Sequence, residues 1–93
     1  MDSGARATLT FSGTGVNVIG YEDQWSGVAN VYLDGKQVAQ VDTYVSDLKA
    51  QANLYSVSGL TAGSHTVAIE AAGTKNANSA GSWVWVDAFE FAP

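Results

Sequence analysis

The chain has 93 residues, a net charge of −5 and only four Lys and Arg residues. This length fits a single domain over residues 1–93, and the acidic charge argues against a nucleic-acid partner, because affinity for a phosphate backbone comes mainly from basic side chains. No apolar run approaches the roughly 18 residues of a membrane span, so no membrane partner is expected. The first residues lack the basic and apolar regions of a signal peptide, which suggests an excised or mature segment. The absence of cysteine excludes disulfides and Cys-based zinc sites.

Short apolar alternations separated by Gly, Asn, Asp and Ser predict an all-β fold, since no stretch carries a helical stripe over three turns. The seven expected strands cover residues 7–12, 15–20, 28–34, 37–43, 52–57, 65–72 and 83–91. Asp34 followed by Gly35 is the favoured pair for a type I′ hairpin turn. After this turn the apolar parity changes at Val41, which predicts a β-bulge near Ala39 or Gln40.

If consecutive strands run antiparallel, the connections alternate between the two ends of a sandwich. The short turns at 12–15, 34–36 and 58–64 then share one end, and the longer polar segments 21–27, 44–51 and 73–82 share the other. Binding groups concentrate on loops that a rigid scaffold holds, so the long-loop end is the expected functional surface. This end carries Tyr21, Trp25, Tyr44, Lys75, Asn76 and Trp83.

Catalytic patterns are weak in this sequence. His65, the sole histidine, begins a strand beside a turn without a Ser-His-Asp or metal-ligand spacing, so we interpret it as structural. Glu22 and Asp23 form the one carboxylate pair that could divide acid and base roles, although neighbouring side chains usually point apart. The glycines of "GTGVNVIG" precede no helix and are turn residues rather than a dinucleotide fingerprint. We therefore expect no enzymatic activity.

Taken together, the stretches "ATLTFSGTGVNVIG", "VANVYLDGKQVAQVDTY", "LYSVSGLTAGSHTVAIEAAGTKN" and "WVDAFEF" follow a recognisable order. In this order and spacing the chain resembles the later strands of a galactose-binding-like jelly roll, an antiparallel β-sandwich. The resemblance covers about residues 7 to 91. Such domains serve as carbohydrate-binding modules in secreted bacterial enzymes, so the resemblance implies a secreted, non-catalytic module of a larger bacterial protein.

One part of the galactose-binding-like domain has no counterpart in this sequence. Such domains have a further stretch before the "TFSGTG" strand, including a strand that completes the sandwich. In several relatives acidic residues of that stretch hold a structural calcium together with an aspartate of the last strand, and Asp87 matches this aspartate. One carboxylate cannot satisfy the six to eight oxygens that calcium takes, so a calcium cofactor at Asp87 is doubtful. A missing strand exposes a backbone edge, which predicts self-association into a homo-oligomer by strand addition or face packing. The alternative is a rearrangement into a smaller closed sandwich.

Sugar recognition combines aromatic rings stacked on pyranose faces with polar side chains that bind the hydroxyls. Trp25 lies off any strand alternation among polar neighbours and is either a ligand platform or a loop anchor, and Tyr21 is similar. Polar partners for a polysaccharide or oligosaccharide on the same loops are Asp23, Lys75 and Asn76.

The segment "SWVWVDAFEF" is apolar on both faces of its alternation. Strict alternation would bury Trp83 and Trp85 with Phe89 and Phe91. A bulge around Asp87 would instead turn the valines inward and leave the two tryptophans outside, as a sugar platform or a subunit contact. In the domains that the chain resembles, a polar residue often stands in place of Trp85, which favours the second arrangement, with Phe89 and Phe91 in the core. Three functions remain open: a sugar-binding module, a self-associating structural β-sandwich, and a small glycosidase or lyase based on Glu22 and Asp23.

Overall fold

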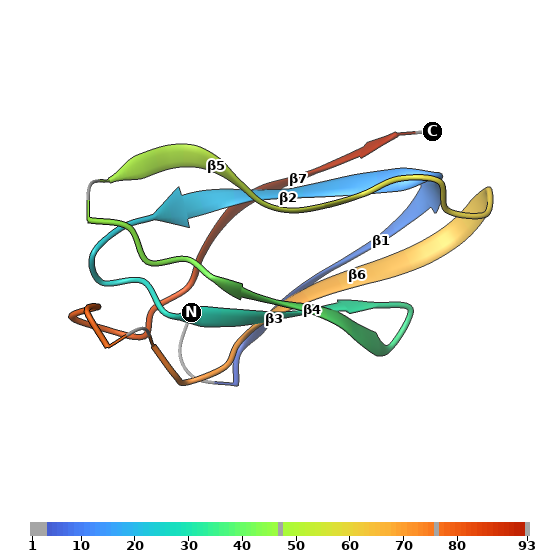
Figure 1. The fold of residues 1–93 in the computed structure, drawn as a ribbon. Coiled ribbons are helices and arrows are strands. Elements are labelled where there is room, and N and C mark those ends of the chain that lie inside the picture. The colour runs from blue at the N-terminus through green and yellow to red at the C-terminus, as the bar shows by residue number, and fades with distance from the viewer. Residues whose placement is uncertain (1–3, 47, 76, 93) are drawn as a thin grey trace.

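The computed structural model describes residues 4–46, 48–75 and 77–92, and all its regular elements are strands (Figure 1). The predicted all-β, seven-stranded antiparallel sandwich is confirmed. The strands are β1 (Arg6–Gly13), β2 (Gly15–Glu22), β3 (Val28–Leu33), β4 (Lys36–Asp42), β5 (Lys49–Val57), β6 (Gly63–Ala71) and β7 (Trp85–Ala92).

Two sheets face each other. One has the order β1-β6-β3-β4 and the other the order β5-β2-β7, and every pairing is antiparallel. The turns β1–β2, β3–β4 and β5–β6 lie at one end of the molecule, while the connections β2–β3, β4–β5 and β6–β7 lie at the other (Figure 1). The predicted division into a short-turn end and a long-loop end is therefore confirmed.

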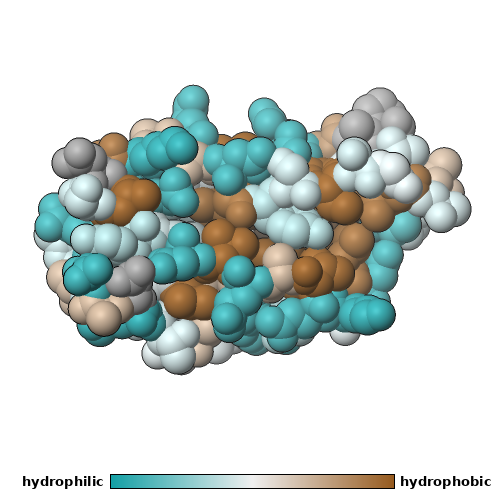
Figure 2. All heavy atoms as spheres, viewed as in Figure 1, coloured by the Kyte–Doolittle hydropathy of each residue, from teal (hydrophilic) through white to brown (hydrophobic). Residues whose placement is uncertain are grey.

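The core lies between the inner faces of the sheets, because alternate residues of each strand point inward. Valines and alanines dominate it, and its fully buried members include Val18, Val31, Val67, Ile69 and Val84. Phe11 is also buried, and Leu60 of the β5–β6 turn packs against the cluster. Figure 2 shows apolar surface along the seam between the two sheets, with hydrophilic residues on either side.

The β3–β4 hairpin has the expected turn. Asp34 and Gly35 have φ values of 52° and 82°, and two positive φ angles define a type I′ turn. The predicted bulge is present, but it lies one residue earlier than expected. Val31 pairs with Ala39 and Tyr32 pairs with Gln37, which leaves Val38 as the extra residue.

The bulge expected around Asp87 is confirmed. Ile19 pairs with Ala88 and Gly20 pairs with Val86, so Asp87 is the extra residue of β7. The bulge reverses the parity of the strand, and Val84 is accordingly buried. Trp83 and Trp85 face outward with 39% and 41% of their surfaces exposed.

One core prediction was wrong. Phe91 is 52% exposed, whereas Phe89 packs against the core. Phe91 lies near the end of an edge strand and has a neighbour on one side only, in β2. Its ring contacts Phe11 across the sandwich at 5.9 Å between centroids, but no further strand covers its other face in the described chain.

Within the part of the chain that the structure describes, no helix has the length and apolar character needed to cross a membrane.

Candidate functional site

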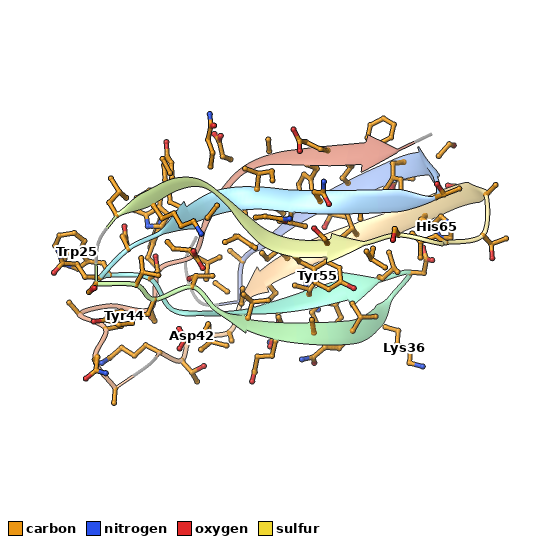
Figure 3. All side chains as sticks on the ribbon, turned by 45° about the horizontal axis from the view of Figure 1, so that its top comes forward. Trp25, Lys36, Asp42, Tyr44, Tyr55 and His65 are labelled. Atoms are coloured by element: carbon orange, nitrogen blue, oxygen red, sulfur yellow. The ribbon has the colours of Figure 1, made fainter. Side chains whose placement is uncertain are left out.

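The three long loops form one connected unit at their end of the sandwich. Asp23 and Tyr44 form a bridge between the β2–β3 and β4–β5 loops, and Ser26 and Trp83 form a second bridge between the β2–β3 and β6–β7 loops. The Trp83 amide also donates to the Trp25 carbonyl at 3.2 Å. Trp25 and Tyr44 both lie at this end in Figure 3. The aromatic residues predicted from separate loops are thus held by one hydrogen-bonded framework.

Asp23 holds the β2–β3 loop from inside. Its side chain is buried, and Oδ1 accepts a hydrogen bond from the Trp25 amide at 3.0 Å and another from the Ser26 hydroxyl at 2.7 Å. Its backbone carbonyl accepts from Val45 of the neighbouring loop. Asp23 was predicted to contact a sugar. Its burial and these bonds hold the β2–β3 loop in place, and Glu22 is directed to Lys49, 4.0 Å away.

The β6–β7 loop is closed by its own polar groups. Lys75 donates from Nζ to the Ser79 carbonyl at 2.9 Å, so its ammonium is turned back into the loop. The buried Ser79 hydroxyl lies within hydrogen-bonding distance of the carbonyls of Gln24, Ser26 and Gly81. Asn76, the other predicted polar partner of a sugar, lies outside the described residues.

Backbones approach very closely where these loops meet. A Cβ atom at Gly27 would lie 2.5 to 2.6 Å from the backbone of Ser82, and one at Gly81 would lie 2.9 Å from the Trp25 carbonyl oxygen. Only glycine permits this approach. It fixes the residue before Trp83 against the base of the β2–β3 loop.

Three aromatic rings form a cluster on the outer face of the three-stranded sheet. The Trp83 and Trp85 centroids are 5.5 Å apart, and Tyr21 follows at 6.4 Å from Trp85, because Tyr21 and Trp85 are cross-strand partners in β2 and β7. All three side chains are more than a third exposed. We call Tyr21, Trp83 and Trp85 the aromatic cluster. Trp25 is 55% exposed on the neighbouring loop.

A hollow of about 330 Å³ lies on the same sheet beyond the aromatic cluster. It is lined by Ile19, Gln51, Asp87, Ala88 and Glu90. Asp87 was predicted as the remnant of a calcium site, but the described residues contain no group of three or more His, Cys, Asp or Glu side chains arranged to hold a metal ion. The donors present do not complete a calcium shell, which takes six to eight oxygens.

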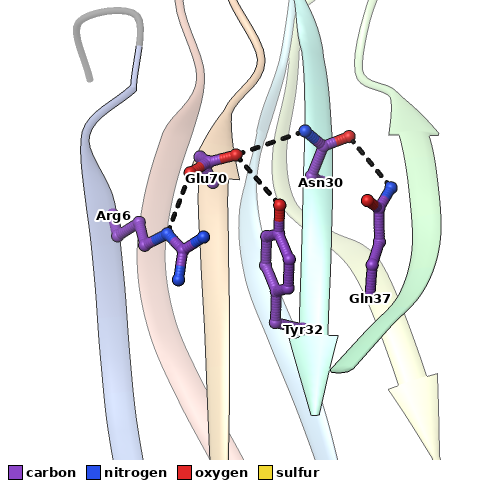
Figure 4. Close-up of polar contacts among 5 residues, drawn as sticks. All are labelled: Arg6, Asn30, Tyr32, Gln37 and Glu70. Atoms are coloured by element: carbon purple, nitrogen blue, oxygen red, sulfur yellow. Dashed lines mark hydrogen bonds and ion pairs between the residues drawn. The ribbon is translucent and has the colours of Figure 1, made fainter. Parts of the chain in front are cut away.

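The outer face of the four-stranded sheet carries a different polar group (Figure 4). Glu70 accepts from Arg6 at 2.9 Å, from Tyr32 at 3.2 Å and from Asn30 at 3.3 Å, and Asn30 in turn accepts from Gln37. The Arg6 hydrogen bond is the main cause that lowers the pKa of Glu70. The Arg6 guanidinium also covers the Tyr32 ring at 4.2 Å. These groups satisfy one another across four strands, so their arrangement supports a structural role.

Sequence reasoning missed Gln51 and Glu90 as members of a surface beside the tryptophans. Both have the pattern of ordinary strand residues. Glu90 could have been found, since alternation from Phe89 places it on the outer face. Gln51 could not, because its position depends on a bulge against β2 and on a backbone φ of 53°.

Comparison with known proteins relates this chain to proteins that act on carbohydrates. Residues 2–81 match the family model described as "Carbohydrate esterase 2 N-terminal". Two curated relatives from Flavonifractor plautii are an A type blood N-acetyl-α-D-galactosamine deacetylase and an A type blood α-D-galactosamine galactosaminidase. They are 38% and 36% identical over 66 residues, which are 71% of this chain but only 8% and 6% of those proteins.

Among solved structures, the chain is similar to a Paenibacillus xanthan lyase with a TM-score of 0.64 and 18% identity. The match covers 98% of this chain and 9% of the lyase, and at this identity it shows the fold alone. The relatives are carbohydrate-active enzymes, and the chain spans only a small part of the length of each. The finer galactose-binding-like assignment stays a prediction.

Proposed function

Because this chain belongs to the carbohydrate esterase 2 N-terminal family, we propose that it is a non-catalytic carbohydrate-binding domain of a larger, secreted bacterial protein. The domain would hold that protein on a polysaccharide or oligosaccharide while another part acts on the sugar. The single observation that carries this proposal is the aromatic cluster of Tyr21, Trp83 and Trp85.

The aromatic cluster has the properties that sugar stacking needs. Its rings are large, partly exposed and in mutual contact, so they hold one another in place before a ligand arrives. Trp85 is fixed by its strand and Trp83 by its bridge to Ser26, which keeps the ordering cost of binding small. Burial of such rings under a pyranose contributes on the order of 1–3 kcal/mol each.

The arrangement of acidic groups supports a non-catalytic role. Asp23 is committed to its loop and Glu22 to Lys49, so this pair does not face a common space where a glycosidic bond would lie. His65 is bound to Asp34 near the short-turn end, at the opposite end of the sandwich from Trp25 (Figure 3). Calcium is not part of the proposal, since Asp87 lacks a ligand set in the described chain.

The first glycans to test contain hexosamines, because both curated relatives are named for galactosamine sugars. We expect binding to quench or shift the tryptophan fluorescence of the chain. Trp83→Ala and Trp85→Ala should each weaken binding about tenfold or more, which corresponds to the loss of one stacked ring.

Two variants control this experiment. Tyr32→Ala removes a ring from the outer face of the other sheet and should leave glycan affinity unchanged. Trp25→Ala separates the two roles predicted for this residue: weaker binding with unchanged stability supports a platform, and lower stability supports a loop anchor. If no glycan on an array changes the fluorescence, sugar binding is refuted.

A second candidate function is a self-associating structural module. Its specific support is the same aromatic cluster, which a second copy of the chain could cover, together with the unpaired edges of the two sheets in the described chain. A molar mass that rises with concentration, combined with no binding to any glycan on the array, would favour this alternative.

A further inference from the structure

Two bulges flank one point of the three-stranded sheet. Asp87 is the extra residue of β7 beside Gly20, and on the other side of β2 the register shifts between Gly20 and Glu22, next to Gln51 of β5. Gln51 has a φ of 53°, a left-handed conformation that is uncommon outside glycine. Bulges redirect side chains and occur often beside binding sites. Here they accompany the hollow that continues the aromatic cluster along the sheet.

The first hollow is close enough to the rings of Trp83 and Trp85 to hold the next sugar unit of a bound oligosaccharide. Asp87 follows Trp85 by two residues, which is about 7 Å at the usual rise of a strand. A second hollow of about 300 Å³, lined by Asn17, Ser58 and Phe91 among others, shares Glu90 with the first. We call the aromatic cluster and the two hollows the track: Asp87 of the first hollow follows Trp85 along β7, and the two hollows meet at Glu90.

The middle of the track is acidic. Asp87 and Glu90 line it together with the neutral Gln51, and no basic side chain of the described residues does so. All four cations of the chain lie elsewhere: Arg6 on Glu70, Lys36 beside the β3–β4 turn, Lys49 toward Glu22 and Lys75 on the Ser79 carbonyl. Two carboxylates in a lining that contains no basic side chain repel an acidic sugar and attract a cationic one.

We infer that an oligosaccharide lies along this track, with one ring on Trp83 and Trp85 and the next unit, bearing a free protonated amine, over Asp87 and Glu90. The inference rests on the proposed sugar-binding function and specifies its ligand class. The acidic side chains select the amine, and Gln51 binds a neighbouring hydroxyl. The tryptophan faces add to the selection, since cations are attracted to aromatic rings. Uronic-acid chains should bind more weakly, because Asp87 and Glu90 repel their carboxylates.

The test compares oligosaccharides of galactosamine and of glucosamine, each in its free-amine and its N-acetylated form. Titration calorimetry on the 93-residue chain should show about three- to tenfold tighter binding of the free-amine form, and this preference should decrease at high salt. Asp87→Asn and Glu90→Gln should reduce the preference while the N-acetylated form binds as before. Trp85→Ala should weaken both forms.

Asp42→Asn is the matched control, because it removes the same charge from β4 of the other sheet. Asn keeps the oxygen that accepts from the Tyr44 amide at 3.0 Å. Equal affinity for the two forms would overturn the amine selection and leave sugar binding intact. If Asp42→Asn loses as much of the preference for the free amine as Asp87→Asn does, the amine selection is also overturned, because the change in net charge alone would then explain the loss. If none of the sugars binds, the proposed sugar-binding function itself is refuted.

Discussion

His65 shows how a residue outside the candidate site acts on the fold. Its Nδ1 lies 2.7 Å from Oδ2 of Asp34, and its Nε2 lies 2.6 Å from the Thr61 carbonyl oxygen. Both ring nitrogens face acceptors, so only the protonated imidazolium can donate to both. The Thr61 hydrogen bond and then the Asp34 hydrogen bond raise the pKa of His65, and the His65 hydrogen bond is the main cause that lowers the pKa of Asp34. The pair joins the β3–β4 and β5–β6 turns.

These shifts predict how stability depends on pH. The raised pKa of His65 means that its contribution is complete below the ordinary value of 6.5 and is lost as pH rises through the folded-state pKa. The lowered pKa of Asp34 means that its contribution is present above 3.8 and is lost as pH falls through the folded-state pKa. The urea midpoint should therefore be highest between these values and decline on the alkaline side.

The matched variant is His65→Gln, which removes the only histidine of the chain. Its urea midpoint should be nearly flat from about pH 6 to 8, the range in which histidine titrates. A parent-like decline in His65→Gln would contradict the assignment of the pH effect to this pair.

At the scale of elements, the glycines of the long loops determine where the tryptophans lie. Gly27→Ala would place a methyl group against the Ser82 backbone. We expect a loss of about 1–3 kcal/mol in the free energy of unfolding, since backbone atoms must move to admit the side chain. The movement would displace Trp83, so the tryptophan emission should shift and glycan affinity should fall. Chemical denaturation and fluorescence measure the two effects.

Gly35→Ala is the comparison for this prediction. A Cβ atom at Gly35 would meet open space, but the residue has a φ of 82°, so the cost of about 1 kcal/mol comes from the backbone conformation. Its turn lies at the opposite end of the sandwich, and the tryptophan emission should stay unchanged. An emission shift of equal size in both variants would show that general destabilisation moves Trp83.

The strands and loops also show which features of the fold could be predicted from the sequence. Strand periodicity located all seven strands within about three residues, because inward positions alternate with outward ones. The apolar character of both faces of its strand left the bulge at Asp87 open, and the resemblance to domains that often carry a polar residue in place of Trp85 favoured it. The buried role of Asp23 could not be predicted, because it depends on bonds to Val45 and Ser26 that form only when the loops meet. The exposure of Phe91 depends on the order of strands in space, which no local pattern contains.

For the whole molecule, the sheet edges determine how copies could meet. Register shifts interrupt the pairings of β4, β5 and β7, and a bulged edge is a poor template for a further strand. The pairing of β1 with β6 is regular over eight residues, from Arg6 to Gly13. The outer edge of β1 is thus the place where the predicted self-association by strand addition would occur.

This location leads to a specific expectation. Light scattering should give a molar mass that rises with concentration, and Thr8→Lys should return it toward that of one chain, because a lysine on an edge strand opposes pairing. Thr8 is exposed, so the lysine reaches solvent without loss of packing. The same lysine at Val38, on the bulged edge β4, adds equal charge and should leave the association unchanged. A single-chain mass at every concentration would contradict self-association. Association through β1 would leave the aromatic cluster, which lies on the other sheet, free for a sugar.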